Sequence, residues 1–236
     1  MLNCSDELFL ELVWKHKLQR VLRYLLHDLS NYLTGNLALS ELYSEGSQGT
    51  DSLYEAIVII RDNCYKEKDV FFEISRLIHP EVNTPDYVDV KCFLDNLEPI
   101  FRQILSPQVQ FSLDTKKIVT RVIRFKPEYL RRIFIQLICN AEEAVRDVIL
   151  PKVSIVCFVE DGNLVCQVQD NGCGFDPESL KNLDLDNPRI QEGYGEHLGL
   201  GLYMVKTYLS LMDGSISIQS VENSETIVTL QFPILI

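Results

Sequence analysis

Three short motifs stand in one order along the chain. They read Gln-Leu-Ile-Cys-Asn-Ala-Glu-Glu-Ala at residues 136–144, Asp-Asn-Gly-Cys-Gly-Phe at residues 170–175 and Gly-Glu-His-Leu-Gly-Leu-Gly-Leu at residues 195–202. Pro127 predicts the start of a helix that carries the first motif. The dipeptide at residues 161–162, Asp-Gly, predicts a hairpin turn between strands at 152–160 and 163–170. The second motif therefore begins where a strand ends.

The second motif has the residue types that a flat, amine-bearing ligand requires. Gly172 and Gly174 allow a close approach of the backbone to such a ligand. The Asp170 carboxylate can accept a hydrogen bond from an exocyclic amine, and adenine carries one. An Asp-Asn-Gly turn without any ligand is the competing interpretation.

The other two motifs suit phosphate and a divalent cation. Gly199 and Gly201 lie where a helix is expected to begin, so that free backbone N–H groups can meet phosphate oxygens. An ordinary glycine-rich loop is the alternative. Asn140 lies in the middle of a helix, and its side-chain oxygen is a suitable ligand for Mg²⁺. A buried asparagine that caps a neighbouring loop is the alternative there, and Glu142 is interpreted as part of a solvated helix face.

Taken together, the motifs resemble the N box and the two glycine boxes of the ATP-binding fold shared by histidine kinases, gyrase, Hsp90 and MutL. Residues 27–35, His-Asp-Leu-Ser-Asn-Tyr-Leu-Thr-Gly, resemble the phosphoacceptor box of histidine kinases. The likeness covers the chain from Val21 to Pro233. It implies a GHKL (Bergerat-type) α/β sandwich that binds ATP and Mg²⁺. The resemblance assigns Asp170 a contact with adenine, and Thr226 or Thr229, in the last strand, a contact with adenine through water.

The chain departs from the family at two positions. ATPases of this fold carry Glu, and histidine kinases usually Asn, where this chain has Gln136. A neutral amide cannot take a proton from water, which predicts poor hydrolysis and transfer of the γ-phosphoryl group to another acceptor. His197 replaces a family glycine two residues before Gly199.

The N-terminal third predicts two long helices, over residues 6–43 and 51–78, joined by the turn cluster at 44–50. Leucines recur at helical spacing at Leu18, Leu22, Leu25, Leu29 and Leu33. An antiparallel helical hairpin cannot bury such a stripe alone, which favours a homodimer with a four-helix bundle. Prolines after residue 79 predict a linker, so the α+β chain divides into a hairpin domain, 1–82, and an ATP-binding domain, 83–236.

His27 is the candidate phosphoacceptor. On a helical wheel it lies about 150° from the centre of the leucine stripe, so it is expected to face solvent. Asp28 can hold the imidazole tautomer and take its proton. The resemblance assigns Asn31 the position at which family members with phosphatase activity orient water. An ordinary surface histidine and a solvated Asn31 are the competing interpretations.

Composition excludes several classes. Lys and Arg number 22 against 34 Asp and Glu, a net charge of −12, and no basic cluster is longer than Arg131-Arg132. Nucleic-acid binding is therefore not expected. No apolar run approaches the ~20 residues of a membrane span, which predicts a cytoplasmic chain without membrane insertion. The seven cysteines contain no C-x-x-C pair and are expected to be reduced.

The sequence predicts a histidine protein kinase of a two-component system. It would autophosphorylate His27 from Mg-ATP and pass the phosphoryl group to an aspartate of a response-regulator receiver domain. A histidine phosphotransferase relay and a phosphatase-biased regulator, each with weak or no use of ATP, remain alternatives. Few residues precede His27, so either the chain is a fragment of a longer kinase or the signal arrives from a separate sensor protein.

Overall fold

The computed structural model describes residues 4–44, 54–65, 67, 87–118, 122–124, 126–181, 183, 185 and 200–234. The chain divides into two compact units. The smaller is Leu18–Val82, and the larger combines Met1–Lys17 with Asn83–Ile236. The expected boundary after residue 82 coincides with one edge of this division, whereas residues 1–17 belong to the larger unit.

Two helices build the smaller unit. Helix α1 (Cys4–Ser44) confirms the first predicted helix, and its residues from Leu18 onward belong to this unit. Residues 54–65 are helical, as predicted, and the remainder of the second predicted helix lies largely outside the described residues. The two helices are joined by side-chain hydrogen bonds, from Asn63 Nδ2 to Asn36 Oδ1 (2.9 Å) and from Asn36 Nδ2 to Glu67 Oε1 (2.8 Å).

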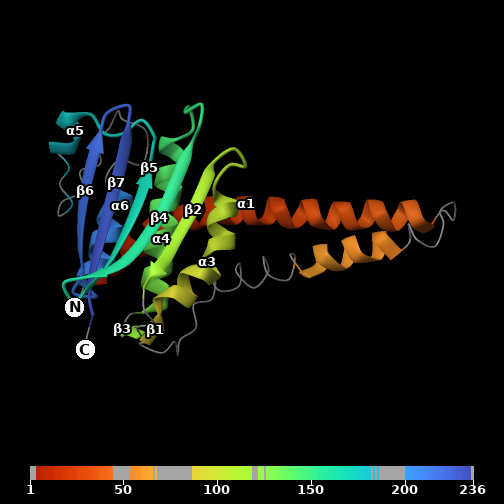
Figure 1. Ribbon diagram of the computed structural model, residues 1–236, viewed down its shortest axis with the longest axis horizontal. Coiled ribbons are helices and arrows are strands. Elements are labelled where there is room, and N and C mark those ends of the chain that lie inside the picture. Colours follow the sequence, from red (N-terminus) through yellow and green to blue (C-terminus); the bar gives the residue numbers. More distant parts are fainter. Residues whose placement is uncertain are drawn as a thin grey trace. The chain divides into compact units, whose positions relative to one another are not determined.

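A mixed five-stranded sheet is the centre of the larger unit (Figure 1). Its strands, in spatial order, are β2 (Gln110–Lys117), β4 (Lys152–Glu160), β5 (Asn163–Asp170), β7 (Glu225–Pro233) and β6 (Ser215–Val221). Strand β2 is parallel to β4, and all other neighbours are antiparallel. The predicted strands over 152–160 and 163–170 are confirmed with the expected bounds.

Three helices cover one face of the sheet: α3 (Val90–Ile104), α4 (Pro127–Ala144) and α6 (Leu200–Ser210) (Figure 1). Helix α4 starts at Pro127, as predicted, and α6 starts where a helix was expected at Gly199 and Gly201. Strands β4 and β7 alternate buried side chains with half-buried ones, as expected of a sheet covered on one face. The core between the layers includes fully buried Leu94, Phe101, Phe134, Val205 and Phe232.

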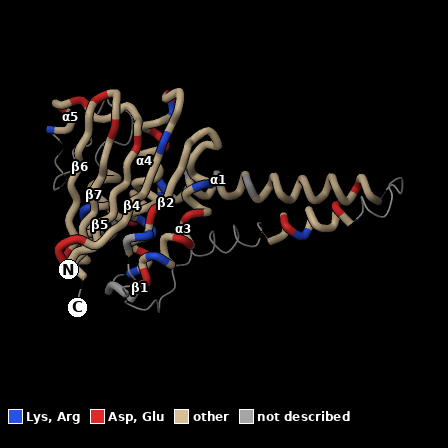
Figure 2. Tube along the Cα trace, in the orientation of Figure 1, with Lys and Arg blue, Asp and Glu red and all other residues tan. Residues whose placement is uncertain are grey.

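Three short elements were not predicted. Strand β1 (Tyr87–Asp89) pairs antiparallel with β3 (Val122–Arg124), and α5 (Pro177–Lys181) follows the second motif. In Figure 2 the Lys and Arg segments of the described chain are scattered among Asp and Glu, with no continuous basic face. None of the described helices has an apolar stretch long enough to cross a bilayer.

The end of β5 meets the last turn of α4 without room for a side chain. A Cβ built on Gly172 would lie 2.6 Å from backbone atoms of Ala144. The next residue, Cys173, donates its N–H to the Ala144 carbonyl oxygen at 3.0 Å. Glycine at 172 therefore fixes how closely the second motif approaches the helix that carries the first.

Replacing Gly172 with alanine should destabilise the larger unit, because the added Cβ forces β5 and α4 apart. We expect a loss of about 2 kcal/mol in the free energy of unfolding, measured by urea denaturation. Gly162→Ala is the control: its φ is +77°, but nothing lies within 4 Å of the added Cβ. It should cost about 1 kcal/mol, from backbone strain alone. An equal or smaller loss for Gly172→Ala would contradict the close-packing argument.

Candidate functional site

Asp170 lies at the end of β5 and is 7% exposed. Its Oδ1 accepts the N–H of Gly172 at 2.9 Å, which is the turn expected of an Asp-Asn-Gly sequence. Among the described residues no other group hydrogen-bonds to this carboxyl. The turn and a ligand contact are therefore compatible, because the turn uses one carboxylate oxygen and leaves Oδ2 to accept a further hydrogen bond.

Burial sets the protonation of this carboxyl. It raises the pKa of Asp170 to about 6, and the Gly172 N–H lowers it in part. A carboxylate that is desolvated and only partly compensated gains most from an added hydrogen-bond donor. Above pH 6 the group is a strong acceptor held at the edge of the core.

Thr226 lies directly opposite Asp170 on β7, and Ser220 lies opposite Thr226 on β6. The Ser220 hydroxyl contacts the Phe175 N–H (2.9 Å), the Glu225 carbonyl (3.0 Å) and Thr226 Oγ1 (2.9 Å). All three contacts are satisfied together only if Ser220 donates to Glu225 and accepts from the other two. Thr226 then donates to Ser220 and offers only lone pairs to a ligand or a water molecule.

The glycine stretch after Asp170 is held against the β6–β7 hairpin by a backbone hydrogen bond and by close packing. Gly174 has a φ of +62°, and a Cβ there would overlap the Val221 carbonyl oxygen. The Asn223 N–H donates to the Cys173 carbonyl at 2.7 Å. The backbone of the second motif is thus held on both sides, by α4 and by the hairpin.

Gln136 and Asn140 occupy successive turns of α4. Gln136 is 4% exposed, and its Nε2 donates to Asn140 Oδ1 at 2.7 Å. Gly201, on α6, lies so close that a Cβ there would overlap the Gln136 amide. Gln136 therefore positions Asn140. The interpretation of Asn140 as a loop cap is not supported, because its hydrogen bond is to its own helix.

The donor set can hold a magnesium ion. After accepting from Gln136, Asn140 Oδ1 keeps a second lone pair, and an amide oxygen is a ligand that Mg²⁺ accepts alongside waters and phosphate oxygens. In the part of the chain that the structure describes, no group of three His, Cys, Asp or Glu side chains is arranged to hold a metal. Asn140 is thus the candidate ligand that the fold supplies.

The three motifs meet at α4. The second motif touches it where Gly172 faces Ala144, and Gly201 of the third motif touches it at Gln136. Gly199 and His197 lie outside the described residues. One interpretation is corrected: Glu142 is buried, not solvated, because its carboxylate accepts the Ser106 N–H at 3.1 Å and the Ser106 hydroxyl.

The candidate phosphoacceptor lies in the smaller unit. His27 is exposed on α1, and Asn31 Nδ2 lies 3.2 Å from its Nδ1. This contact between residues one turn apart orients the imidazole. Asp28 is in the same helix, and its side chain is outside what the structure describes.

Two residues that shape the candidate site were not predicted from the sequence. Ser220 joins the glycine stretch to Thr226. Asn171 accepts the Lys152 N–H at 2.6 Å and donates to the Leu150 carbonyl at 2.9 Å, which ties the motif to the start of β4. The Ser220 contact could have been predicted from the pairing of the last two strands, whereas the Asn171 contacts depend on the tertiary fold.

Comparison with known proteins agrees with this geometry. Residues 125–236 match the family described as histidine kinase-, DNA gyrase B-, and HSP90-like ATPase, and the match does not include residues 1–124. No curated protein matches the chain.

Among solved structures, a mycobacterial sensor histidine kinase, MprB, is 16% identical with a TM-score of 0.51, over 63% of this chain and 97% of that one. Full-length ShkA in complex with AMPPNP is 14% identical with a TM-score of 0.53, over 92% of this chain and 46% of that one. The histidine kinase AdeS of Acinetobacter baumannii is 17% identical with a TM-score of 0.47, over 88% and 98%. Residues 125–236 are therefore similar to the histidine kinase-, DNA gyrase B- and HSP90-like ATPase family, and the fold of the chain resembles that of the MprB and ShkA structures.

Proposed function

We propose that this chain is a histidine protein kinase of a two-component system. It autophosphorylates His27 from Mg-ATP and passes the phosphoryl group to an aspartate in a response-regulator receiver domain. The observation that carries the proposal is the combination, in one chain, of a domain from an ATP-binding family with a helix that presents an exposed histidine oriented by Asn31.

The larger unit binds the nucleotide in this proposal. The Asp170 carboxylate accepts a hydrogen bond from the adenine amine, and the lone pairs of Thr226 accept from a bridging water. Gly172 and Gly174 let the backbone come close to the base. Gly199 and Gly201, before and in the first turn of α6, provide backbone N–H groups for the phosphates.

Asn140 holds Mg²⁺, which neutralises phosphate charge when bound. Gln136 keeps the Asn140 amide in place by donating to its Oδ1. Because an amide cannot act as a base, Gln136 does not activate water, and the γ-phosphoryl group is preserved for the histidine.

Transfer takes place at the imidazole of His27. A ring nitrogen forms a bond to the γ-phosphorus as the bond to the bridging oxygen breaks, and ADP leaves with that oxygen. Asp28 takes the ring proton. The receiver aspartate then attacks the same phosphorus, and the imidazole is the leaving group.

A homodimer is part of the proposal, and the surface of the smaller unit supports it. Its large exposed apolar side chains are Leu26, Leu33, Leu37, Leu42, Tyr54, Ile57, Ile59 and Tyr65. The end of α1, from residue 29 to 44, carries a single charged residue, Glu41, as the tan stretch in Figure 2 reflects. Leu25 of the predicted stripe is fully buried, so the surface left for a partner helix pair differs from that stripe. A cytoplasmic location and a separate sensor protein complete the proposal.

A second candidate function is a phosphatase acting on the phosphorylated regulator. The contact between Asn31 Nδ2 and His27 Nδ1 favours it, since an amide held beside the imidazole can also orient water. The two functions are compatible in one chain. A relay that does not use ATP is the remaining alternative, and the first experiment below distinguishes it.

The kinase assignment is tested with γ-labelled ATP and Mg²⁺. The wild-type chain should acquire acid-labile, base-stable label, and His27→Gln should acquire none while it still binds nucleotide. His16→Gln, a second histidine of α1, is the matched control and should keep the label. Label on His27→Gln would disprove the phosphoacceptor. Absence of label on every variant, with phosphate accepted from a phosphorylated regulator, would identify a relay.

Asp170→Asn should weaken the binding of Mg-ATP and, at the same time, raise the free energy of unfolding of the chain without nucleotide. The amide cannot replace the anionic acceptor, so affinity for Mg-ATP should fall about tenfold or more. Because the folded-state pKa of Asp170 is raised to about 6, wild type loses stability as pH rises through that value. The variant should therefore be more stable by about 2 kcal/mol at pH 8, and this advantage should disappear toward pH 4.

Calorimetric titration and urea denaturation at both pH values measure the two effects. Wild-type affinity should itself weaken below about pH 6, where the carboxyl is protonated. A variant that binds Mg-ATP as tightly as wild type would rule out the adenine contact.

Asn31→Ala tests the phosphatase function. Autophosphorylation should be retained, whereas loss of phosphate from the phosphorylated regulator should slow by at least about tenfold, because the water is no longer oriented. Thr34→Ala, an exposed change on the same helix, is the control. Equal rates for wild type and Asn31→Ala would refute the role of Asn31.

A further inference from the structure

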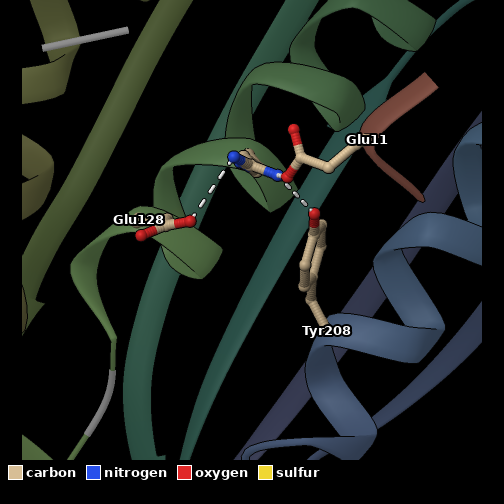
Figure 3. A network of polar contacts seen from close by, with 4 residues as sticks. Glu11, Glu128 and Tyr208 are labelled. Carbon is tan, nitrogen blue, oxygen red and sulfur yellow. Dashed lines mark hydrogen bonds and ion pairs between the residues drawn. The ribbon is translucent and has the colours of Figure 1, made fainter. Parts of the chain in front are cut away.

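A buried arginine joins three helices of the larger unit. Arg132, on α4, is 7% exposed. Its Nη1 donates to Glu11 Oε1 on α1 and to Tyr208 Oη on α6, each at 2.6 Å, and its Nη2 lies 3.4 Å from Glu128 Oε1 (Figure 3). The family resemblance assigns no role to this position.

Residues near the start of α1 pack against Arg132. Trp14 is 4% exposed, and the Arg132 guanidinium carbon lies 5.2 Å from the centre of its ring. Leu10 is 2% exposed, and Lys17 Nζ pairs with Glu143 Oε1 at 3.4 Å. We call the contacts of Glu11, Trp14 and Lys17 with α4 and α6 the clasp.

The contacts of the clasp stabilise the position of α1 that the structure shows. Arg132 is desolvated, so loss of Glu11 and Trp14 would leave a buried cation with fewer partners, which is costly. All of the clasp residues belong to one compact unit of the chain.

The clasp and the candidate nucleotide site share the α4–α6 interface. Arg132, Gln136 and Asn140 are spaced at four residues, which places them on one face of α4. On α6, Tyr208 meets Arg132, and Gly201 meets Gln136. Helix α6 is thus held at one end by the clasp and at the other by the residue that positions the candidate Mg²⁺ ligand.

We propose that the clasp is thermodynamically coupled to occupancy of the nucleotide site. The seated clasp holds α6 on α4 and so keeps Gly201, Gln136 and Asn140 in the arrangement that binds nucleotide. By reciprocity, bound nucleotide makes the clasp harder to open. Any interaction that displaces the start of α1 from α4 and α6 therefore weakens nucleotide binding. The inference rests on the proposed function in that the site binds ATP.

Trp14 is the chain's only tryptophan, so its fluorescence reports the clasp directly. The probe is AMPPNP with Mg²⁺, added to the full chain. Acrylamide quenching of Trp14 should decrease as AMPPNP saturates the site, because the clasp opens less often. Quenching that is independent of AMPPNP, under conditions where calorimetry shows binding, would overturn the coupling.

Substitutions test the reverse direction. Glu11→Gln removes the negative charge that faces Arg132, and Tyr208→Phe removes a hydroxyl acceptor. Each should weaken AMPPNP affinity about fivefold. Glu98→Gln is the matched control: it breaks a 2.6 Å ion pair with Arg102 on α3, away from the clasp, and should leave affinity unchanged. Melting temperatures of all variants identify any that simply unfold.

The outcomes separate the two proposals. If wild type binds no AMPPNP, the proposed function and the coupling both fail. If wild type binds AMPPNP and both clasp variants bind it equally well, the coupling alone is wrong. If Tyr208→Phe lowers the melting temperature and Glu11→Gln does not, the affinity of Glu11→Gln decides, because Glu11 is largely exposed and its loss leaves the core intact.

Discussion

The site depends on how closely two other elements can approach helix α4. Strand β5 reaches it because residue 172 has no side chain, and α6 reaches it because residue 201 has none. A helix surface carries ridges of side chains, so approach at this distance is open only to glycine. The distance along α4 between Gln136 and Ala144 then sets the separation between the third motif and the second.

The buried carboxyl of Asp170 lowers the free energy of unfolding when it is ionised. Its carboxyl is buried with one backbone donor, and the raised pKa records that the charged form is insufficiently compensated. A fold selected only for stability would place an amide or an apolar residue there. A buried carboxylate with a single backbone donor keeps the capacity to accept a further hydrogen bond from a ligand.

Secondary structure could be predicted from the sequence where a turn or helix-start residue stands next to a regular pattern of apolar residues. The strands around the 161–162 turn and the helix begun by Pro127 follow from local rules, which place the second motif at a strand end and the first on a helix. The role of Glu142 was not predicted, because a hydrogen bond to Ser106 requires knowing which segments become neighbours. The role of Ser220 was not predicted either, although the pairing of the last two strands brings it opposite Thr226. The β1–β3 pair was missed because three residues carry too little pattern.

Among the described residues of the smaller unit, Asn36 fixes how the two helices are aligned along their lengths. It is hydrogen-bonded to both Asn63 and Glu67 across the two helices. Sliding one helix along the other by a turn, about 5.4 Å, would separate these side chains and break both bonds. The position of His27 along its neighbouring helix is therefore set by polar contacts that lie more than two turns away on α1.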